Sequence, residues 1–317
     1  MREQTKFLIL VGLLLVVIVL FMGYNVSGNI DYVLSKRAIR LSTMLVVGMS
    51  VAISSVIFQT ITNNRILTPS IMGYESIYIL FQTLLVFVYG DQTFKVISQQ
   101  QNFLYSIVLM LGFSLFMYML MFGKNQKNMF YLLLTGMVMG ALFQTMSQFL
   151  HVLIDPNEFS IVQNFMFVSF AKMNTKLLAI ASITLLLTLI YVIPYLKYLD
   201  VIALGRDHAI NLGVNYRGLI RRFMLVISLL VSISTALVGP ITFLGILVAN
   251  LTYELFSSRK HRFMVLASSL IACLSLLLGQ FFVEHIFGFS TTVSIIINFI
   301  GGVYFMFLLW KTRKSIS

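Results

Sequence analysis

Long runs of apolar residues alternate with short polar segments along almost the whole chain. An α-helix needs about 20 apolar residues to cross the hydrocarbon core of a bilayer. The pattern therefore predicts ten membrane-spanning helices, at residues 7–23, 41–60, 72–89, 103–122, 129–150, 177–196, 219–237, 241–256, 263–283 and 293–310. The eighth run is short and begins at the Gly239-Pro240 pair, so the count of spans around residues 237–256 stays open.

Composition places the chain in lipid. Of its 317 residues, 59% are hydrophobic and 10% are charged, and the mean hydropathy is +0.95. A soluble domain cannot bury so much apolar surface. We therefore expect an all-α membrane protein in which residues 1–317 form a single polytopic domain. Arg2 and Lys6 precede the first run, but no small-x-small cleavage pattern precedes Asn25, so this run is interpreted as a retained span.

The positions of the basic residues predict the topology. The chain has 22 Lys and Arg residues and a formal net charge of +12. With the N-terminus in the cytoplasm and ten alternating spans, the outer side keeps only Lys36, Arg37, Arg40, Lys95, Lys172 and Lys176. This bias obeys the positive-inside rule and predicts a multi-pass protein of the cytoplasmic membrane with both termini inside. The charge then reflects topology, so membrane lipid is an expected partner and nucleic acid is not.

Groups suited to catalysis or metal binding are not clustered in the sequence. Glu75, Glu254 and Glu284 lie near span ends, where headgroups and water are expected to solvate them. The lone Cys273 leaves no disulfide or thiolate site, and no two histidines have a metal-binding spacing. We therefore expect no enzyme, no catalytic residue, and no cofactor or metal bound by this chain.

ATP would have to be supplied by another subunit, because the chain has no G-x-x-x-x-G-K-[ST] loop. The same absence fits a channel or a facilitator that needs no ATPase.

Uncharged polar residues inside the spans are the candidates for a transport pathway. Gln59 ends the second span, Gln144 and Gln148 share one face of the fifth, and Asn298 lies in the tenth. For each residue alone, a hydrogen bond between helices is the commoner role. The Gln144–Gln148 pair favours a pathway.

Arg37 and Arg40 lie at the start of the second span, on the side where positive charge is disfavoured. Such residues commonly extend to lipid headgroups. A pair retained against topology also suggests a contact with acidic residues of a docking protein.

A polar segment interrupts the apolar pattern at residues 204–214. Asp207 can cap a helix and Gly213 can end it, which predicts a short helix on a surface open to a partner. The candidate contact residues are Leu204, Gly205, Arg206, Asp207, His208, Ala209, Leu212 and Gly213.

Five motifs, in order along the chain, resemble those of the iron–siderophore and cobalamin ABC-importer permeases, the type II importers. Residues 37–40 (R-A-I-R) are similar to R-x-P-R, and residues 64–73 are similar to N-P-L-A-x-P-x-x-L-G. Residues 204–214 resemble the coupling element L-G-x-D-x-A-x-x-L-G-V. Residues 239–245 resemble G-P-I-x-F-x-G, and residues 261–262 match the end of D-H-R.

Several positions depart from the family pattern. Ile39 replaces a proline, Lys260 an aspartate, and Ala249-Asn250 a Pro-His pair. Glu284 stands where an outer arginine is common, and residues 289–293 lack the E-L-P-V-G turn.

The resemblance implies the type II importer permease fold with short cytoplasmic coupling helices. It implies as partners a second permease, two ATPase subunits that bind ATP and Mg²⁺, and an extracytoplasmic substrate-binding protein, with a lipid anchor expected from the composition. Because a homodimer would repeat the Glu284 charge reversal, we expect the second permease to be a homologous but different chain.

The resemblance also implies roles for particular residues. Residues 204–213 would contact the ATPases, and Arg37, Arg40 and Glu284 would face the binding protein. The pathway and its gate would include Gln59, Asn64, Thr68, Pro69, Gly73, Gln144, Gln148 and Asn298. Ferric siderophore is the expected cargo. Haem or cobalamin remains an alternative, and a stand-alone carrier is a more distant one.

Overall fold

The computed structural model describes residues 3–26, 29–122, 129–170, 173–258 and 260–314. Five of the basic residues that enter the charge bias lie outside these ranges, namely Arg2, Lys124, Lys127, Lys172 and Arg259.

Within the described ranges every regular element is a helix, which confirms the predicted all-α class. Short 3-10 helices join some of the α-helices: η1 (Pro69–Met72), η2 (Gly90–Gln92) and η3 (Ile193–Tyr195). The α-helices are α1 (Glu3–Gly23), α2 (Ile30–Thr62), α3 (Tyr74–Tyr89), α4 (Thr93–Val96), α5 (Gln99–Phe122), α6 (Met129–Leu153), α7 (Pro156–Met166), α8 (Thr175–Val192), α9 (Leu196–Ile202), α10 (Arg206–Asn211), α11 (Tyr216–Val238), α12 (Leu244–Leu255), α13 (His261–His285) and α14 (Val293–Lys314).

Each predicted span corresponds to a helix, although two of the ten are short. Among the described residues, eight helical stretches are long and apolar enough to cross a membrane, and the shorter apolar helices are Leu244–Leu255 and Val293–Phe307. The 12 residues of α12 extend only about 18 Å, against about 30 Å of hydrocarbon. Residues 239–243 precede α12 without helical structure and supply further length.

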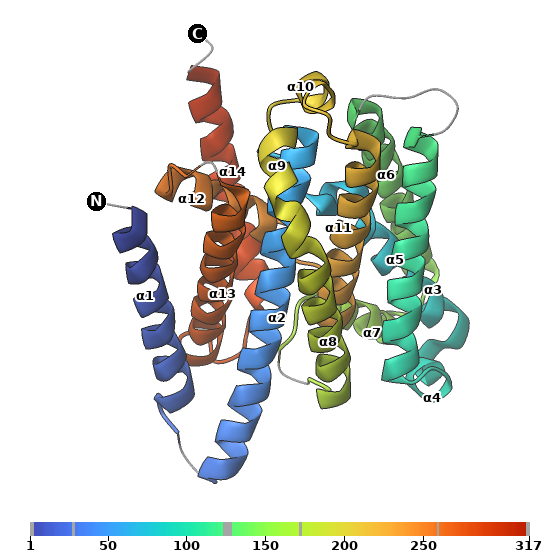
Figure 1. Cartoon of the computed structure of the whole chain (residues 1–317). Coiled ribbons are helices and arrows are strands. Elements are labelled where there is room, and N and C mark those ends of the chain that lie inside the picture. Colours follow the sequence, from blue (N-terminus) through green and yellow to red (C-terminus); the bar gives the residue numbers. More distant parts are fainter. Residues whose placement is uncertain (1–2, 27–28, 123–128, 171–172, 259, 315–317) are drawn as a thin grey trace.

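The core lies where α2 contacts α11 and α13 at the centre of the molecule (Figure 1). In the most apolar 18-residue stretch of α11, 72% of the residues are buried, whereas in the corresponding stretch of α1 only 17% are buried. Helix α1 is apolar on all sides and exposes Leu8, Val16 and Val19, as expected of a helix that faces lipid. Gly48 of α2 lets the two central helices approach, because a Cβ there would lie 3.1 Å from the Cys273 backbone of α13.

The two ends of the bundle differ. Helix α10, the start of α1 and the end of α14 lie at one end, here called the α10 end (Figure 1). Helix α2 begins at the opposite end, where α13 finishes and α4 and α8 begin (Figure 1). The Lys6 Nζ donates to the Leu255 carbonyl oxygen at 2.7 Å, which places the end of α12 beside the start of α1. The chain therefore returns to the α10 end through the short α12.

Candidate transport pathway and docking surfaces

The predicted short helix at residues 204–214 is present as α10, which lies at one end of the helix bundle (Figure 1). Its N-cap is Gly205, whose φ of +102° suits glycine, and no side chain caps the helix. The prediction that Asp207 is the cap was wrong, because Asp207 lies inside the first turn, where its charge favours the helix dipole. Gly213 ends the helix as predicted, with a φ of +77°.

Helix α10 exposes apolar side chains to its surroundings. Leu204 is 59% exposed and Leu212 is 63% exposed, and Ile210 is also exposed, whereas Ala209 is buried against the bundle. Helix α10 packs on α9 and α11 beneath it. Exposed leucines on both sides of a small, glycine-bounded helix at the end of the bundle form a surface suited to a protein partner.

Arg37 faces inward rather than outward. Its guanidinium is buried and donates to the carbonyl oxygens of Phe21, Met22 and Tyr24, at 3.1, 3.1 and 2.8 Å. A cation at this place satisfies the last carbonyls of α1 and complements the negative end of its dipole. The arginine therefore joins α1 to α2, and a direct contact with a docking protein stays a prediction.

Arg40 is paired with Glu284. Its Nη1 lies 2.8 Å from Glu284 Oε1, which also accepts a hydrogen bond from Gln280 Nε2 at 2.7 Å. The Glu284 side chain is only 6% exposed. The guanidinium of Arg40 also lies over the ring of Phe289, 5.8 Å from its centroid. The acid at the position where the family pattern has an arginine thus holds Arg40 of the same chain.

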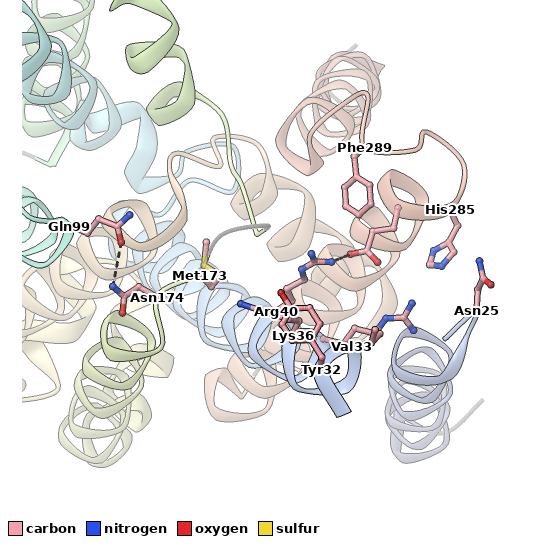
Figure 2. Close-up of a pocket in the computed structure, with 12 residues that line it drawn as sticks. Asn25, Tyr32, Val33, Lys36, Arg40, Gln99, Met173, Asn174, His285 and Phe289 are labelled. Atoms are coloured by element: carbon pink, nitrogen blue, oxygen red, sulfur yellow. Dashed lines mark hydrogen bonds and ion pairs between the residues drawn. The ribbon is translucent and has the colours of Figure 1, made fainter. Parts of the chain in front are cut away.

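A cavity of about 740 Å³ surrounds this pair at the end of the bundle where α2 begins. Figure 2 shows Lys36 and Arg40 of α2 on one side of it, His285 and Phe289 on another, and Asn174 with Gln99 on a third. Asn174 Nδ2 donates to Gln99 Oε1 at 3.3 Å and joins α8 to α5 there. The lining is polar and carries charge of both signs.

The segment after α2 turns back into the bundle. Asn64 Oδ1 accepts a hydrogen bond from the Ile66 backbone N–H at 2.9 Å, and Pro69 begins η1. Gly73 then adopts a φ of +90° directly against α6, where an added Cβ would lie 2.9 Å from Gly140 Cα. Gly140 is nine residues into the Tyr131–Leu153 span, about 13 Å along the helix. Helix α3 therefore starts beside the middle of α6 and not beside its end.

Two of the predicted pathway residues are buried without hydrogen-bond partners. Among the described residues, none bonds to the side-chain Oε1 or Nε2 of Gln59 or to the Thr68 hydroxyl. Ser55, one turn before Gln59 on α2, and Thr68 both approach Gly245 at the start of α12. Unsatisfied buried polar atoms cost about 1–3 kcal/mol each, which favours a further state or ligand that satisfies them.

The remaining pathway candidates lie in different places. Gln144 and Gln148 are exposed on α6, away from the chain's own core. Asn298 instead faces inward, and its Oδ1 accepts a hydrogen bond from the Phe243 backbone N–H at 3.4 Å. The structure thus brings Thr68, Gly245 and the segment before α12 together, and leaves the two glutamines of α6 for another molecule or for lipid.

Sequence reasoning missed three polar contacts near these segments. Asn250 Nδ2 donates to the Arg65 carbonyl oxygen at 2.8 Å, so the departure from Pro-His ties α12 to the segment after α2. Asp200 of α9 accepts from the His261 backbone N–H at 2.8 Å and contacts His261 Nδ1 at 2.6 Å. An acid from another helix therefore caps α13, where Lys260 replaces the family's own aspartate.

The third missed contact involves Glu75, which the sequence placed near headgroups. Its Oε1 accepts a hydrogen bond from Ser70 and its Oε2 one from Thr242. That expectation was wrong because the chain enters the bundle before α3 begins. The sequence did hold a sign of this contact. Glu75 is an acid two residues after the motif at residues 64–73, in which Arg65 carries the only charge.

Helices of membrane-spanning length and a small exposed helix at one end define the class, a multi-pass helical membrane protein. The model of the FecCD transport family matches residues 8–311. The chain therefore belongs to the FecCD transport family, which confirms the resemblance to iron–siderophore ABC-importer permeases.

The comparisons also identify individual relatives. The chain is 49% identical to the petrobactin import system permease protein YclO of Bacillus subtilis (strain 168), over 99% of this chain and 100% of the relative. It is 32% identical to the petrobactin import system permease protein FatC of Bacillus anthracis, over 89% and 79%. FatD, from the same system and organism, is 24% identical over 96% and 90%.

A solved metal-chelate type ABC transporter in an inward-facing conformation has the same fold. It superposes with a TM-score of 0.85, at 22% identity, over 98% of this chain and 100% of the other. The predicted type II importer permease fold is thereby confirmed.

Proposed function

We propose that this chain is the membrane-spanning subunit through which an ABC importer takes up a ferric siderophore across the cytoplasmic membrane. The observation that carries the proposal is the 49% identity, over 99% of the chain, to a permease of a petrobactin import system. The polar, uncharged character of Gln59, Thr68, Gln144 and Gln148 suits a bulky chelate that passes without being tightly held.

The α10 end is assigned to the cytoplasm. Arg206, Arg217 and Arg222 belong to the helices that begin there, as the positive-inside rule requires. Two ATPase subunits bind the exposed Leu204 and Leu212 surfaces, one under each permease, and ATP with Mg²⁺ is bound and hydrolysed by these partners. Residues 204–213 transmit the resulting motion to α9 and α11, on which α10 rests.

A second permease completes the pathway. Gln144 and Gln148 are exposed on α6, where they line a route between two permeases better than they suit lipid. FatC and FatD are two distinct permease proteins of one petrobactin import system. This supports a homologous but different chain as the partner.

The opposite end receives the substrate-binding protein, which we expect to be lipid-anchored. Arg40 and Glu284 line the outer cavity beside Lys36. Arg37 also lines this cavity and contributes by fixing α1 against α2, because its Nη1 is engaged by the end of α1.

The test is an uptake assay in a bacterial host that lacks its own siderophore permeases. The chain is expressed with a second FecCD permease, the ATPases and the binding protein, and radioactive iron is supplied as ferric petrobactin. ATP-dependent uptake is expected, while haem and cobalamin should not compete. Competition by haem or cobalamin would reassign the cargo, and uptake by the chain alone without ATP would overturn the importer assignment.

A further inference from the structure

Glu75 is a carboxylate that no step of the proposed function uses. It is the second residue of α3 and follows Gly73, whose Cα packs against Gly140 of α6. That contact lies about 13 Å from the Tyr131 end of the α6 span and about 20 Å from the Leu153 end. An ionisable group at such depth is costly and, in membrane proteins, commonly functional.

Each carboxylate oxygen of Glu75 holds a different segment of the chain. Oε1 accepts from the Ser70 hydroxyl of η1 at 2.7 Å, and Oε2 accepts from the Thr242 hydroxyl at 2.6 Å. Thr242 belongs to residues 239–243, between α11 and α12. Both distances are those of well-formed hydroxyl–oxygen hydrogen bonds. Among the described residues, the ion pairs are Arg40–Glu284 and His261–Asp200, so hydroxyls and not a cation hold Glu75.

Glu75 also lines a small internal cavity of about 20 Å³, room for about one water molecule. Four hydroxyl residues line this space beside valine and isoleucine, namely Ser54 and Ser55 of α2 and Ser234 and Thr235 of α11. Several hydroxyl groups around one internal space are expected where water enters in another state.

The two segments that Glu75 connects interrupt the long α-helices, as the 3-10 turn η1 and as the non-helical residues 239–243. Non-helical backbone at membrane depth is tolerated only where it is buried in protein or lines a cavity. Resting on the proposed transport function, we propose that Glu75 is a positioning residue of the gate. Its carboxylate holds residues 69–72 against residues 239–243 in the closed pathway, and the pathway opens when both hydrogen bonds break.

The proposal is tested with variants that each remove one hydroxyl donor, Ser70→Ala and Thr242→Val, in the complete transporter in liposomes. Removing one such hydrogen bond shifts an equilibrium by about two- to tenfold. Opening is followed at Ser54→Cys in a Cys273→Ala background, with a water-soluble maleimide as the probe. The labelling rate and the ATP hydrolysed per imported chelate are both expected to rise several-fold.

Thr252→Val and Ser50→Ala are the matched controls, because their buried hydroxyls bond only to carbonyls of their own helices, at 2.7 and 2.8 Å. Neither control should change the labelling or the coupling ratio, and all variants should keep the wild-type thermal midpoint within a few degrees. In a Glu75→Gln background, Thr242→Val should add little, because both changes act on one interaction.

The outcomes are distinct. Unchanged labelling and coupling in Ser70→Ala and Thr242→Val would overturn the gate role. The role would also be overturned if the test variants and the control variants all lost thermal stability and transport to the same extent. Because the labelling requires no substrate, a labelling response without uptake of ferric siderophore would refute the proposed cargo and leave the gate role supported.

Discussion

At the scale of single residues, Arg37 belongs to a motif expected at a docking surface, yet its side chain joins two helices of the chain itself. Its place in R-A-I-R predicts an outward, docking arginine, yet its three hydrogen bonds go to the last carbonyls of α1. The helix-terminal carbonyls have no partner within α1, so a neighbouring cation is the natural donor. A sequence pattern gives the position of such a residue on α2 but not the helix that passes beside it.

Arg37→Met should therefore weaken the attachment of α1. The substitution keeps much of the apolar stem and removes the donors, at a cost of about 3 kcal/mol. Thermal unfolding of the purified chain in detergent should show a lower midpoint than wild type. Lys36→Met, which removes an equal charge from the exposed neighbouring position, should leave the midpoint nearly unchanged. Equal effects of both substitutions would contradict the role of Arg37 in joining the two helices.

At the scale of elements, α10 joins the bundle through Ala209 and presents Leu204 and Leu212 outward. We expect Leu212→Asp to place a charge in the proposed ATPase contact without touching the core, since the side chain is 63% exposed. The ATPase subunits should then no longer co-purify with the permease. Leu212→Met should retain them.

Gly205→Pro offers a second test of α10, because proline cannot adopt the φ of +102° at this N-cap. It should displace the helix and abolish both ATPase binding and uptake. Normal assembly of either Leu212→Asp or Gly205→Pro would count against α10 as the coupling element.

The approach of η1 to α6 depends on two glycines. A Cβ on Gly140 would lie 3.1 Å from Gly73 Cα, and both contacts are backbone, which cannot rotate away. Gly140→Leu should push the start of α3 outward and abolish uptake while the chain still inserts in the membrane. Gly112→Leu on α5, where an added Cβ has nothing within 4 Å, is the control and should transport normally. Uptake that survives Gly140→Leu would show that the close approach is dispensable.

The helices themselves could be predicted because lipid demands long apolar runs, and such runs are read directly from the sequence. The depth at which each begins could not. Span three was expected from residue 72, but a hydropathy pattern does not show that residues 63–73 enter the bundle first, which is why Glu75 was misplaced. The Asp207 cap failed for a related reason: Gly205 supplies a backbone angle that no side-chain pattern reports.

The hydrogen-bond and ion-pair partners of the buried polar groups could not be predicted from the sequence either. Asp200 and His261 are 61 residues apart, and Arg40 and Glu284 are 244 apart, so only the fold brings each pair together. Glu284 was recognised as a charge reversal from its position in the sequence. Its pairing with Arg40 within the same chain was not.

At the scale of the whole molecule, the arrangement of charge at the outer end bears on how the transporter is assembled. Glu284 forms an ion pair with Arg40 in this chain. In a homodimer, both arginines proposed to contact the binding protein would therefore be neutralised. Opposite charges steer and orient such an encounter. A partner permease with an arginine at the corresponding place would restore one attractive site.

We therefore expect a heterodimer. When this chain is co-expressed with a second FecCD permease and the ATPases, an affinity tag on this chain should recover the second permease in equal amount. Two differently tagged copies of this chain should not recover each other.

In a Cys273→Ala background, Gln144→Cys should cross-link to a cysteine on the second permease, since Gln144 is exposed on α6. Leu8→Cys, exposed on the lipid-facing α1, should not. An active importer that contains only this permease would refute the heterodimer, and the binding protein would then have to dock through Lys36 and the remaining polar rim of the outer cavity.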